Sequence, residues 1–208
     1  DLLSLYPETM TNMALEHGGT IDQYIGDGIM LFFGDPETKG VREDAAQCVN
    51  MALEMLRALD NLSDEWAKYG LRDQLQMRIG IDTGFATVGN FGCESRLDYT
   101  AIGAAVNRAS RLETAADNGS IYISEDTYNL VKDSIIAEAL PPIHLKGIGE
   151  FLARKVKSSR DSSAISMELG ERSVSFVLDN LSETELDEAT LSLQKAIEDI
   201  QSFKITGT

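Results

Sequence analysis

Positive charge is scarce in this chain of 208 residues, because 18 Lys and Arg residues stand against 34 Asp and Glu, which gives a net charge of -16. A nucleic acid or an anionic membrane surface binds proteins through clustered cations, so the composition argues against both partners. Any phosphate group that this chain binds must instead meet a few individually placed cations or a metal ion.

Cysteine and long apolar runs are also scarce. The two cysteines, Cys48 and Cys93, have no metal-ligand spacing and suit a reducing compartment. No apolar run approaches the length that spans a bilayer, and the first residues lack the features of a signal peptide. We therefore expect a cytoplasmic segment without direct membrane insertion, in a parent protein that could itself be tethered to a membrane.

The length and the 43% hydrophobic content suit one domain with an appendage. A shift in composition divides the chain into residues 1–157 and 158–208. The second part opens with a Ser-rich stretch that we expect to be a linker, and it has ten acidic and three basic residues from Asp161 onward. A strand at 174–178 and a helix at 185–203 are predicted there, with docking or dimer contact as the expected role.

Hydrophobic periodicity predicts the elements of the first part in the order helix, hairpin, helix, hairpin, helix and strand. The expected elements are a helix ending at 17–19, a hairpin of 20–25 and 29–34, a helix over 42–69, strands at 77–84 and 85–89, a polar turn at 92–99, a helix over 105–113, a strand at 121–123, a helix over 125–132 and a strand edge at 143–147. This order fits an α/β (α+β) sandwich with a ferredoxin-like βαββαβ core, in which helices pack on a mainly antiparallel sheet.

Four polar side chains stand where they could take part in chemistry. Asp27, at a tight turn between two apolar runs, offers the hard oxygen ligands that Mg²⁺ prefers, although taken alone it is better explained as an ordinary Asp-Gly turn. Asn107 and Arg111 lie one helical turn apart and suit a sugar and a phosphate, with a solvated helix face as the alternative. Lys146 could bind a phosphate as a point charge, which is a weak indication by itself.

The order and spacing of these residues add information. The segments that contain them are 15–34, 80–84, 98–103 with 106–112, and 145–147. Over roughly residues 1–157 they resemble the catalytic domains of class III adenylyl and guanylyl cyclases. The resemblance implies that Asp27 binds metal, Asn107 positions the ribose, Arg111 stabilises the transition state and Lys146 binds the triphosphate.

The same resemblance implies a reaction and an assembly. The ribose 3′-oxygen would attack the α-phosphorus of a nucleoside triphosphate, and pyrophosphate would leave, with two Mg²⁺ or Mn²⁺ ions in each active site. The enzyme would be a homodimer with its sites between the subunits. Asp27 of one subunit would then act together with Gln23 and Lys146 of the other.

Base choice in the family rests on two positions, here Gln23 and Thr100, and Ile102 is a further expected substrate contact. Adenylyl cyclases typically have Lys with Asp or Thr, and guanylyl cyclases have Glu with Cys. Thr100 is therefore of the adenylyl type, whereas Gln23 matches neither pattern. Both side chains can donate or accept hydrogen bonds. We expect ATP as the substrate, with a guanylyl or relaxed-specificity cyclase as the alternative.

One family motif, resembling FxDxxGFT, does not occur in this sequence. We therefore expect the chain to lack the first strand of the domain and one metal-binding acid. A fragment of a longer protein, which could carry an upstream sensor domain, explains this better than a decayed enzyme, because the four site residues are intact. A non-catalytic nucleotide-binding or dimerisation module is the competing hypothesis. A diguanylate cyclase is disfavoured, since no Gly-Gly-Asp/Glu-Glu-Phe run is present.

Overall fold

The computed structural model describes residues 2–68, 76–93, 96–160, 164–169 and 172–177, together with 190–191 and 194–195. It divides into two compact units, Asp1–Arg160 and Asp161–Thr208. In the second unit β11 (Ala164–Leu169) and β12 (Arg172–Val177) pair as an antiparallel hairpin, which confirms the predicted strand near 174–178. The predicted helix at 185–203 lies largely outside the described residues.

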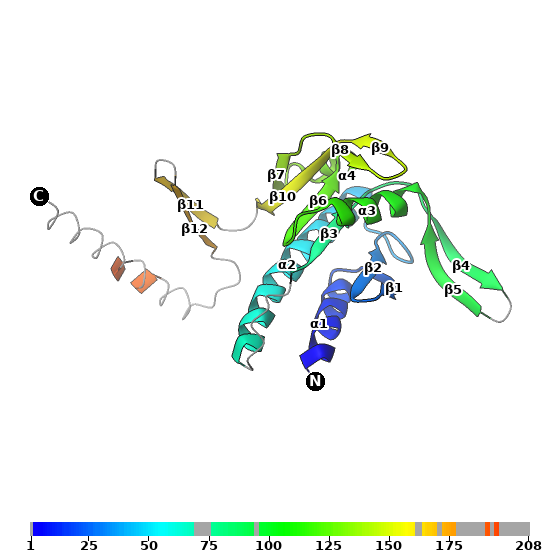
Figure 1. Ribbon diagram of the computed structural model, residues 1–208, viewed down its shortest axis with the longest axis horizontal. Coiled ribbons are helices and arrows are strands. Elements are labelled where there is room, and N and C mark those ends of the chain that lie inside the picture. The colour runs from blue at the N-terminus through cyan, green and yellow to red at the C-terminus, as the bar shows by residue number, and fades with distance from the viewer. Residues whose placement is uncertain are drawn as a thin grey trace, which may run out of the picture. The chain divides into compact units, whose positions relative to one another are not determined.

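A four-stranded sheet forms the centre of the first unit (Figure 1). Its strands, in spatial order, are β3 (Arg78–Ile81), β6 (Ser120–Ser124), β10 (Ala153–Ser159) and β7 (Ile135–Ala139). β3 and β6 run parallel, and the other neighbours are antiparallel. The helices that contact these strands are α2 (Val41–Lys68), α3 (Ala104–Ala115) and α4 (Glu125–Val131). The predicted fold class, a mainly antiparallel sheet with packed helices, is confirmed.

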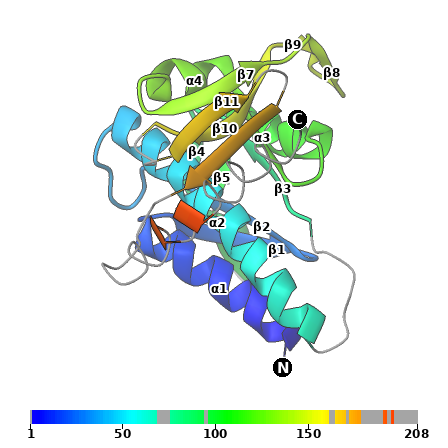
Figure 2. The same ribbon diagram turned by 90° about the vertical axis from the view of Figure 1, so that its left-hand side faces the viewer.

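Next to this sheet, α1 (Leu2–Glu16) lies along α2, as Figures 1 and 2 both show. α1 ends where the sequence predicts, and Gly18 follows with a φ of 83° that favours glycine. His17 joins the two helices, because its Nε2 lies 2.9 Å from Glu54 Oε2 on α2. The chain then forms the predicted hairpin of β1 (Thr20–Ile25) and β2 (Gly28–Phe32).

α2 buries apolar side chains on two sides. Towards the sheet it contributes to a cluster made of Ala45, Val49, Ala52, Leu53, Ile81, Ile121, Ile123, Val131, Ile135 and Val156. Towards α1 it contributes to a second cluster made of Met10, Ala14, Met51, Met55 and Leu62. Cys48 packs against both clusters, and burial raises the pKa of its thiol to about 12. α2 therefore fixes α1 and the β1–β2 hairpin to the sheet.

The second predicted hairpin is wrong. The segments 77–84 and 85–89 do not pair, because β3 ends at Ile81 and pairs with β6. The hairpin is instead formed by β4 (Thr87–Cys93) and β5 (Arg96–Ile102), so much of the stretch 92–99 is strand where a polar turn was predicted. Figure 1 shows this ribbon extending away from the four-stranded sheet. Strands that do not pack on a core lack the apolar alternation by which strands are recognised in a sequence.

The end of the first unit contains strands that the pattern did not reveal. β7 and β10 were not predicted, and the predicted strand edge at 143–147 is the short β8 (Ile143–Leu145), paired with β9 (Gly149–Phe151). Ser158 and Ser159, expected to open a linker, are the last residues of β10. The pairing of β10 with both β6 and β7 makes it a central strand, which explains why it continues through serine.

Candidate active site

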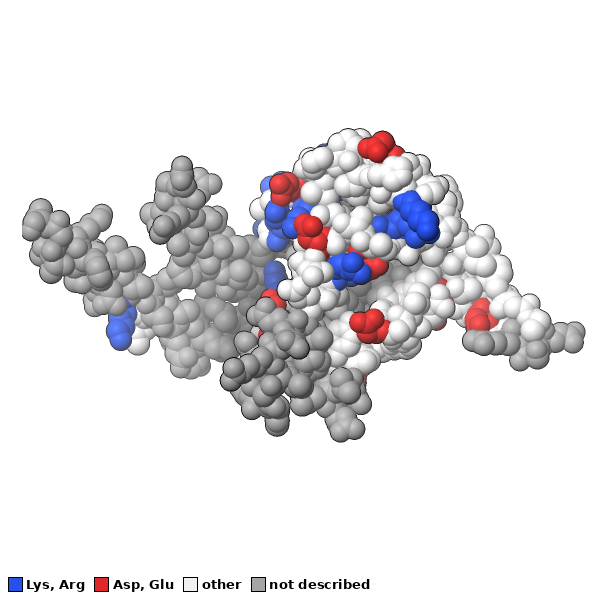
Figure 3. All heavy atoms as spheres, viewed as in Figure 1, with Lys and Arg blue, Asp and Glu red and all other residues white. Residues whose placement is uncertain are grey.

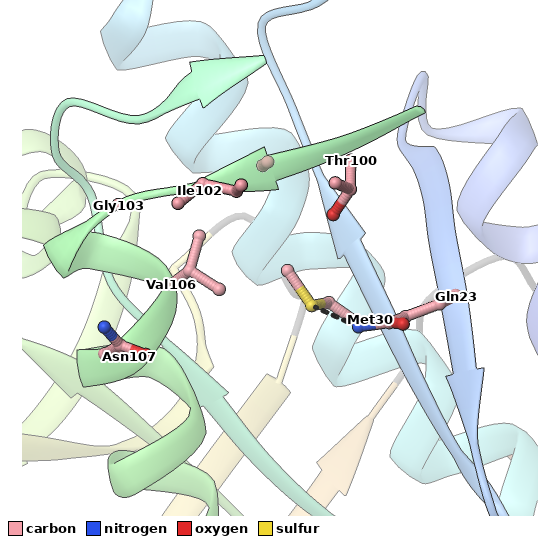
Figure 4. A pocket seen from close by; sticks show the side chains of 8 residues that line it. Gln23, Met30, Thr100, Ile102, Gly103, Val106 and Asn107 are labelled. Atoms are coloured by element: carbon pink, nitrogen blue, oxygen red, sulfur yellow. Dashed lines mark hydrogen bonds between the residues drawn. The ribbon is translucent and has the colours of Figure 1, made fainter. Parts of the chain in front are cut away.

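A hollow of about 280 Å³ lies between the β1–β2 hairpin, the end of β5 and the start of α3. It is lined by Gln23, Met30, Thr100, Ala101, Ile102, Gly103, Val106 and Asn107. Figure 4 shows Gln23 and Met30 on the hairpin opposite Thr100 of β5, with Asn107 in the first turn of α3. The structure thus brings together four of the sequence-predicted site residues. These are Gln23, Thr100, Ile102 and Asn107.

Close backbone contact fixes α3 beside this hollow. A Cβ atom on Gly80 of β3 would lie 2.2 Å from Ala109 O and 2.2 Å from Glu113 N of α3. A Cβ atom on Gly103, just before α3, would lie 2.8 Å from Phe85 O. Only glycine fits such an approach of one backbone to another. The position of Asn107 and Arg111 is therefore set by Gly80, which lies outside the hollow, and by Gly103, which lines it.

Two ion pairs also join α3 to the β3 region. Arg108 donates from Nε and Nη2 to Asp82 Oδ2 at 2.9 and 2.8 Å, and the Asp82 side chain is 0% exposed. The other oxygen of this carboxylate, Oδ1, is buried and has no hydrogen-bond partner. Arg78 pairs with Glu113 at 3.0 Å, but both of these side chains are exposed. The two pairs connect the same two elements and differ in burial.

This difference predicts unequal losses of stability. Arg108→Ala leaves the Asp82 carboxylate buried without a counter-charge, so we expect the free energy of unfolding to fall by about 3 kcal/mol or more. Arg78→Ala removes an exposed pair between the same elements and should cost less than about 1 kcal/mol. Urea unfolding of both variants measures the difference. Equal losses would contradict a structural role for the buried pair.

Two predicted phosphate-binding residues, Arg111 and Lys146, are exposed and do not line the hollow. Arg111 follows Asn107 by one turn of α3, and Lys146 lies in the turn between β8 and β9. Their sequence neighbours Leu112 and Leu145 pack in one buried cluster, which holds α3 against β8. None of the ion pairs between described residues uses either cation, so both remain available for an anion.

The predicted metal ligand, Asp27, lies elsewhere. It is exposed in the turn between β1 and β2, next to Gly26 with a φ of 63°. The last two residues of β1, Tyr24 and Ile25, and the turn residue Gly26 separate it from Gln23. Burial raises the pKa of Tyr6, and the Asp27 charge adds a smaller rise, which places this carboxylate towards α1. The structure does not bring Asp27 together with the residues of the hollow.

Metal binding by this chain needs further ligands. Among the described residues there is no group of three or more His, Cys, Asp or Glu side chains that could hold a metal ion. Asp27 alone offers one hard carboxylate. Mg²⁺ is commonly held by one or two carboxylates together with substrate phosphates and water. Asp27 fits such an ion as one ligand of a set that the nucleotide and other side chains complete.

Asp22, which precedes Gln23 on β1, was not among the predicted site residues. Its Oδ2 accepts hydrogen bonds from Thr100 Oγ1 at 2.8 Å and from the backbone N of Ala101 at 3.2 Å. A second hydrogen bond joins β5 to the segment after β2, because the hydroxyl of Tyr99 on β5 donates to Asp35. The available signal was an acid between the apolar Ile21 and the predicted base-selecting Gln23. β5 is therefore fixed beside β1 by polar contacts on consecutive residues.

The surface of the described residues fits the low content of basic residues. On the face in Figure 3, Lys and Arg side chains form small separate groups, some of them beside Asp or Glu. No helix within the described part of the chain is long and apolar enough to cross a membrane.

The first unit thus combines a sheet with packed helices and a hollow lined by polar side chains from the β1–β2 hairpin, β5 and α3. Residues 6–158 match the family model described as the adenylate and guanylate cyclase catalytic domain. The chain belongs to this family. The predicted family resemblance is thereby confirmed.

Known relatives agree with the match. The adenylyl cyclase CyaB from P. aeruginosa has a similar structure with a TM-score of 0.75 and 44% sequence identity, covering 77% of this chain and 83% of that one. The guanylate cyclase domain of RhGC from Catenaria anguillulae, in complex with GTP, has a TM-score of 0.66 and 25% identity, covering 76% and 82%. Adenylate cyclase 1 of Rhizobium meliloti is 37% identical over 77% of this chain and 23% of its own length.

The curated relatives are much longer than the matched region, because the chain spans between 7% and 23% of their length. Members of the family generally use divalent metal ions. Both adenylate and guanylate cyclases occur among the relatives.

Proposed function

We propose that this domain converts ATP to 3′,5′-cyclic AMP and pyrophosphate in the cleft of a homodimer, with two Mg²⁺ or Mn²⁺ ions in each site. The observation that supports this most is the hollow itself. It combines Gln23, Thr100 and Asn107 beside a helix that presents Arg111 one turn further on. A base, a ribose and a triphosphate need these groups in this order along one surface.

The residues of this chain have distinct parts in the proposed reaction. Asn107 would hold the ribose so that its 3′-oxygen lies in line with the α-phosphorus. As that oxygen bonds to the α-phosphorus, the bond to the bridging oxygen of pyrophosphate breaks. Arg111 would neutralise charge that grows on the α-phosphoryl oxygens, and Lys146 would bind the triphosphate. Metal ions held at Asp27 and the phosphates would lower the pKa of the attacking hydroxyl.

Asp27 is the reason to propose a dimer. It lies in the turn after β1 and does not line the hollow, so a nucleotide in the hollow of one protomer needs the Asp27 carboxylate of another. Exposed apolar side chains stand on the two hairpins that flank the hollow and in the loop before β4. They are Tyr24, Ile25, Phe85, Leu97 and Ile102. Phe85 is 102% exposed, and burial of such groups favours association.

Conversion of GTP is the second candidate, because of the orientation of Gln23. Its Nε2 donates to Met30 Sδ at 3.6 Å, a weak contact that leaves the amide oxygen as an acceptor. An acceptor suits the N1–H group of guanine, whereas adenine N1 needs a donor. Rotation of the Gln23 amide exchanges its oxygen acceptor and its nitrogen donor, so Gln23 permits either base.

Product analysis with ATP and GTP in parallel tests the proposal. The full-length protein that contains this chain should release cyclic AMP and an equal amount of pyrophosphate from ATP in the presence of Mg²⁺. Chelation of the metal should abolish both products, and added Mg²⁺ or Mn²⁺ should restore them. Absence of cyclic product from either nucleotide would overturn the proposal. Thermal stabilisation by ATP without turnover would instead indicate a nucleotide-binding module.

A further inference from the structure

Asp22 does not line the hollow but is hydrogen-bonded to two residues that do, Thr100 and Ala101. Its side chain is on β1, 78 residues before Thr100 in the chain, and it is partly buried in the contact with β5. A carboxylate can only accept hydrogen bonds. At 2.8 Å from Asp22 Oδ2, the hydroxyl of Thr100 must therefore donate its proton to Asp22.

This bond determines what the hydroxyl can offer to a ligand. A Thr hydroxyl has one proton and two lone pairs, so once the proton is used the group is an acceptor only. The same carboxylate oxygen holds Ala101 N at 3.2 Å, which limits movement of this part of β5. Thr100 lines the hollow opposite Gln23, as Figure 4 shows. A ligand in the hollow thus meets a fixed acceptor on the β5 side.

Purines differ in the hydrogen bond that they offer at C6. Adenine has an amino group there, which donates, and guanine has a carbonyl oxygen, which accepts. A fixed acceptor in the protein accepts a hydrogen bond from the amino group of adenine. With guanine, the same acceptor faces the carbonyl oxygen, which is also an acceptor, and no hydrogen bond forms. Because Gln23 can rotate and suit either base, Thr100 is the one of these two facing side chains that distinguishes the purines.

We propose that Asp22 is a positioning residue of the nucleotide site, which holds the Thr100 hydroxyl as an acceptor and thereby favours a purine with an amino group at C6. The inference rests on the proposed cyclase function and adds to it a residue that sets the substrate class. Asp22 does not touch the substrate. It acts by fixing the direction of one hydrogen bond.

The test compares ATP with inosine triphosphate, which has a carbonyl at C6 and lacks the second amino group of GTP. In the full-length protein, Asp22→Ala frees the hydroxyl to donate, so the ratio of kcat/KM for ATP to that for inosine triphosphate should fall about tenfold. Asp22→Asn is the matched control, because its amide oxygen can accept both bonds, and its ratio should stay within about threefold of the wild-type value.

A merely structural role for Asp22 would lower both kcat/KM values together and leave their ratio unchanged, which would overturn the inference. Should Asp22→Ala fail to fold, Thr100→Val removes the same acceptor and should lower the ratio to a similar extent. An unchanged ratio in that variant also overturns the inference. A wild-type enzyme that prefers inosine triphosphate to ATP would also overturn the inference about Asp22, but it would leave the proposed cyclase function intact. Absence of any cyclic product from wild type would instead refute the proposed function.

Discussion

Arg111→Ala is expected to lower kcat by at least about a hundredfold, with little change in KM for ATP. The guanidinium would meet charge that develops only in the transition state, and loss of one such group typically costs this much. Lysine keeps the charge but not the fork of donors, so Arg111→Lys should recover only part of the rate. Steady-state kinetics of the full-length protein with ATP and Mg²⁺ measures both variants.

A surface arginine that does not line the hollow provides the control. Arg42 on α2 is 66% exposed and forms a loose pair with Asp133 at 3.5 Å. Arg42→Ala removes the same charge and should leave kcat at the wild-type value. A kcat for Arg111→Ala within threefold of wild type would remove Arg111 from the proposed mechanism. A rise in KM with kcat unchanged would assign it to ground-state binding instead.

Periodicity predicted the elements that bury a continuous apolar stripe. α2 is the clearest case, because it packs on both the sheet and α1 and its apolar positions recur at helical spacing. The β4–β5 hairpin was not predicted correctly, for the opposite reason. Leu97 is 60% exposed and Tyr99 40%, so no buried face imposes an alternating pattern there. A strand that extends into solvent or meets another molecule gives no such signal.

The site was predicted unevenly for a related reason. Asn107 and Arg111 could be placed on one helix face because their spacing is a local property of the chain. The meeting of Gln23 with Thr100 is not local, and only the family resemblance connected them before the structure showed both in the hollow. Asp22 was missed because its role depends on contact between β1 and β5, which no feature of its own strand reveals.

Mixing two inactive variants is expected to restore activity if the sites are shared. Asp27→Ala and Arg111→Ala chains should each retain no more than about 1% of the wild-type rate. A heterodimer of the two has one site damaged twice and one site that is complete. Each heterodimer therefore retains about half of the wild-type activity, whereas an unsorted random mixture of the two chains would retain about one quarter. Co-expression of two differently tagged chains, purified through both tags, measures the recovery.

The decisive control pairs two variants of the same side of the site. Asn107 and Arg111 both lie on α3, so a heterodimer of Asn107→Ala with Arg111→Ala has one defect in each of its two sites. That mixture should stay inactive. Recovery in neither mixture would show that Asp27 serves the hollow of its own protomer, although it does not line that hollow. Recovery in both mixtures would indicate residual activity of the single variants. Every site of the Asn107→Ala and Arg111→Ala heterodimer takes its α3 from one of the two altered chains, so none of its sites is complete.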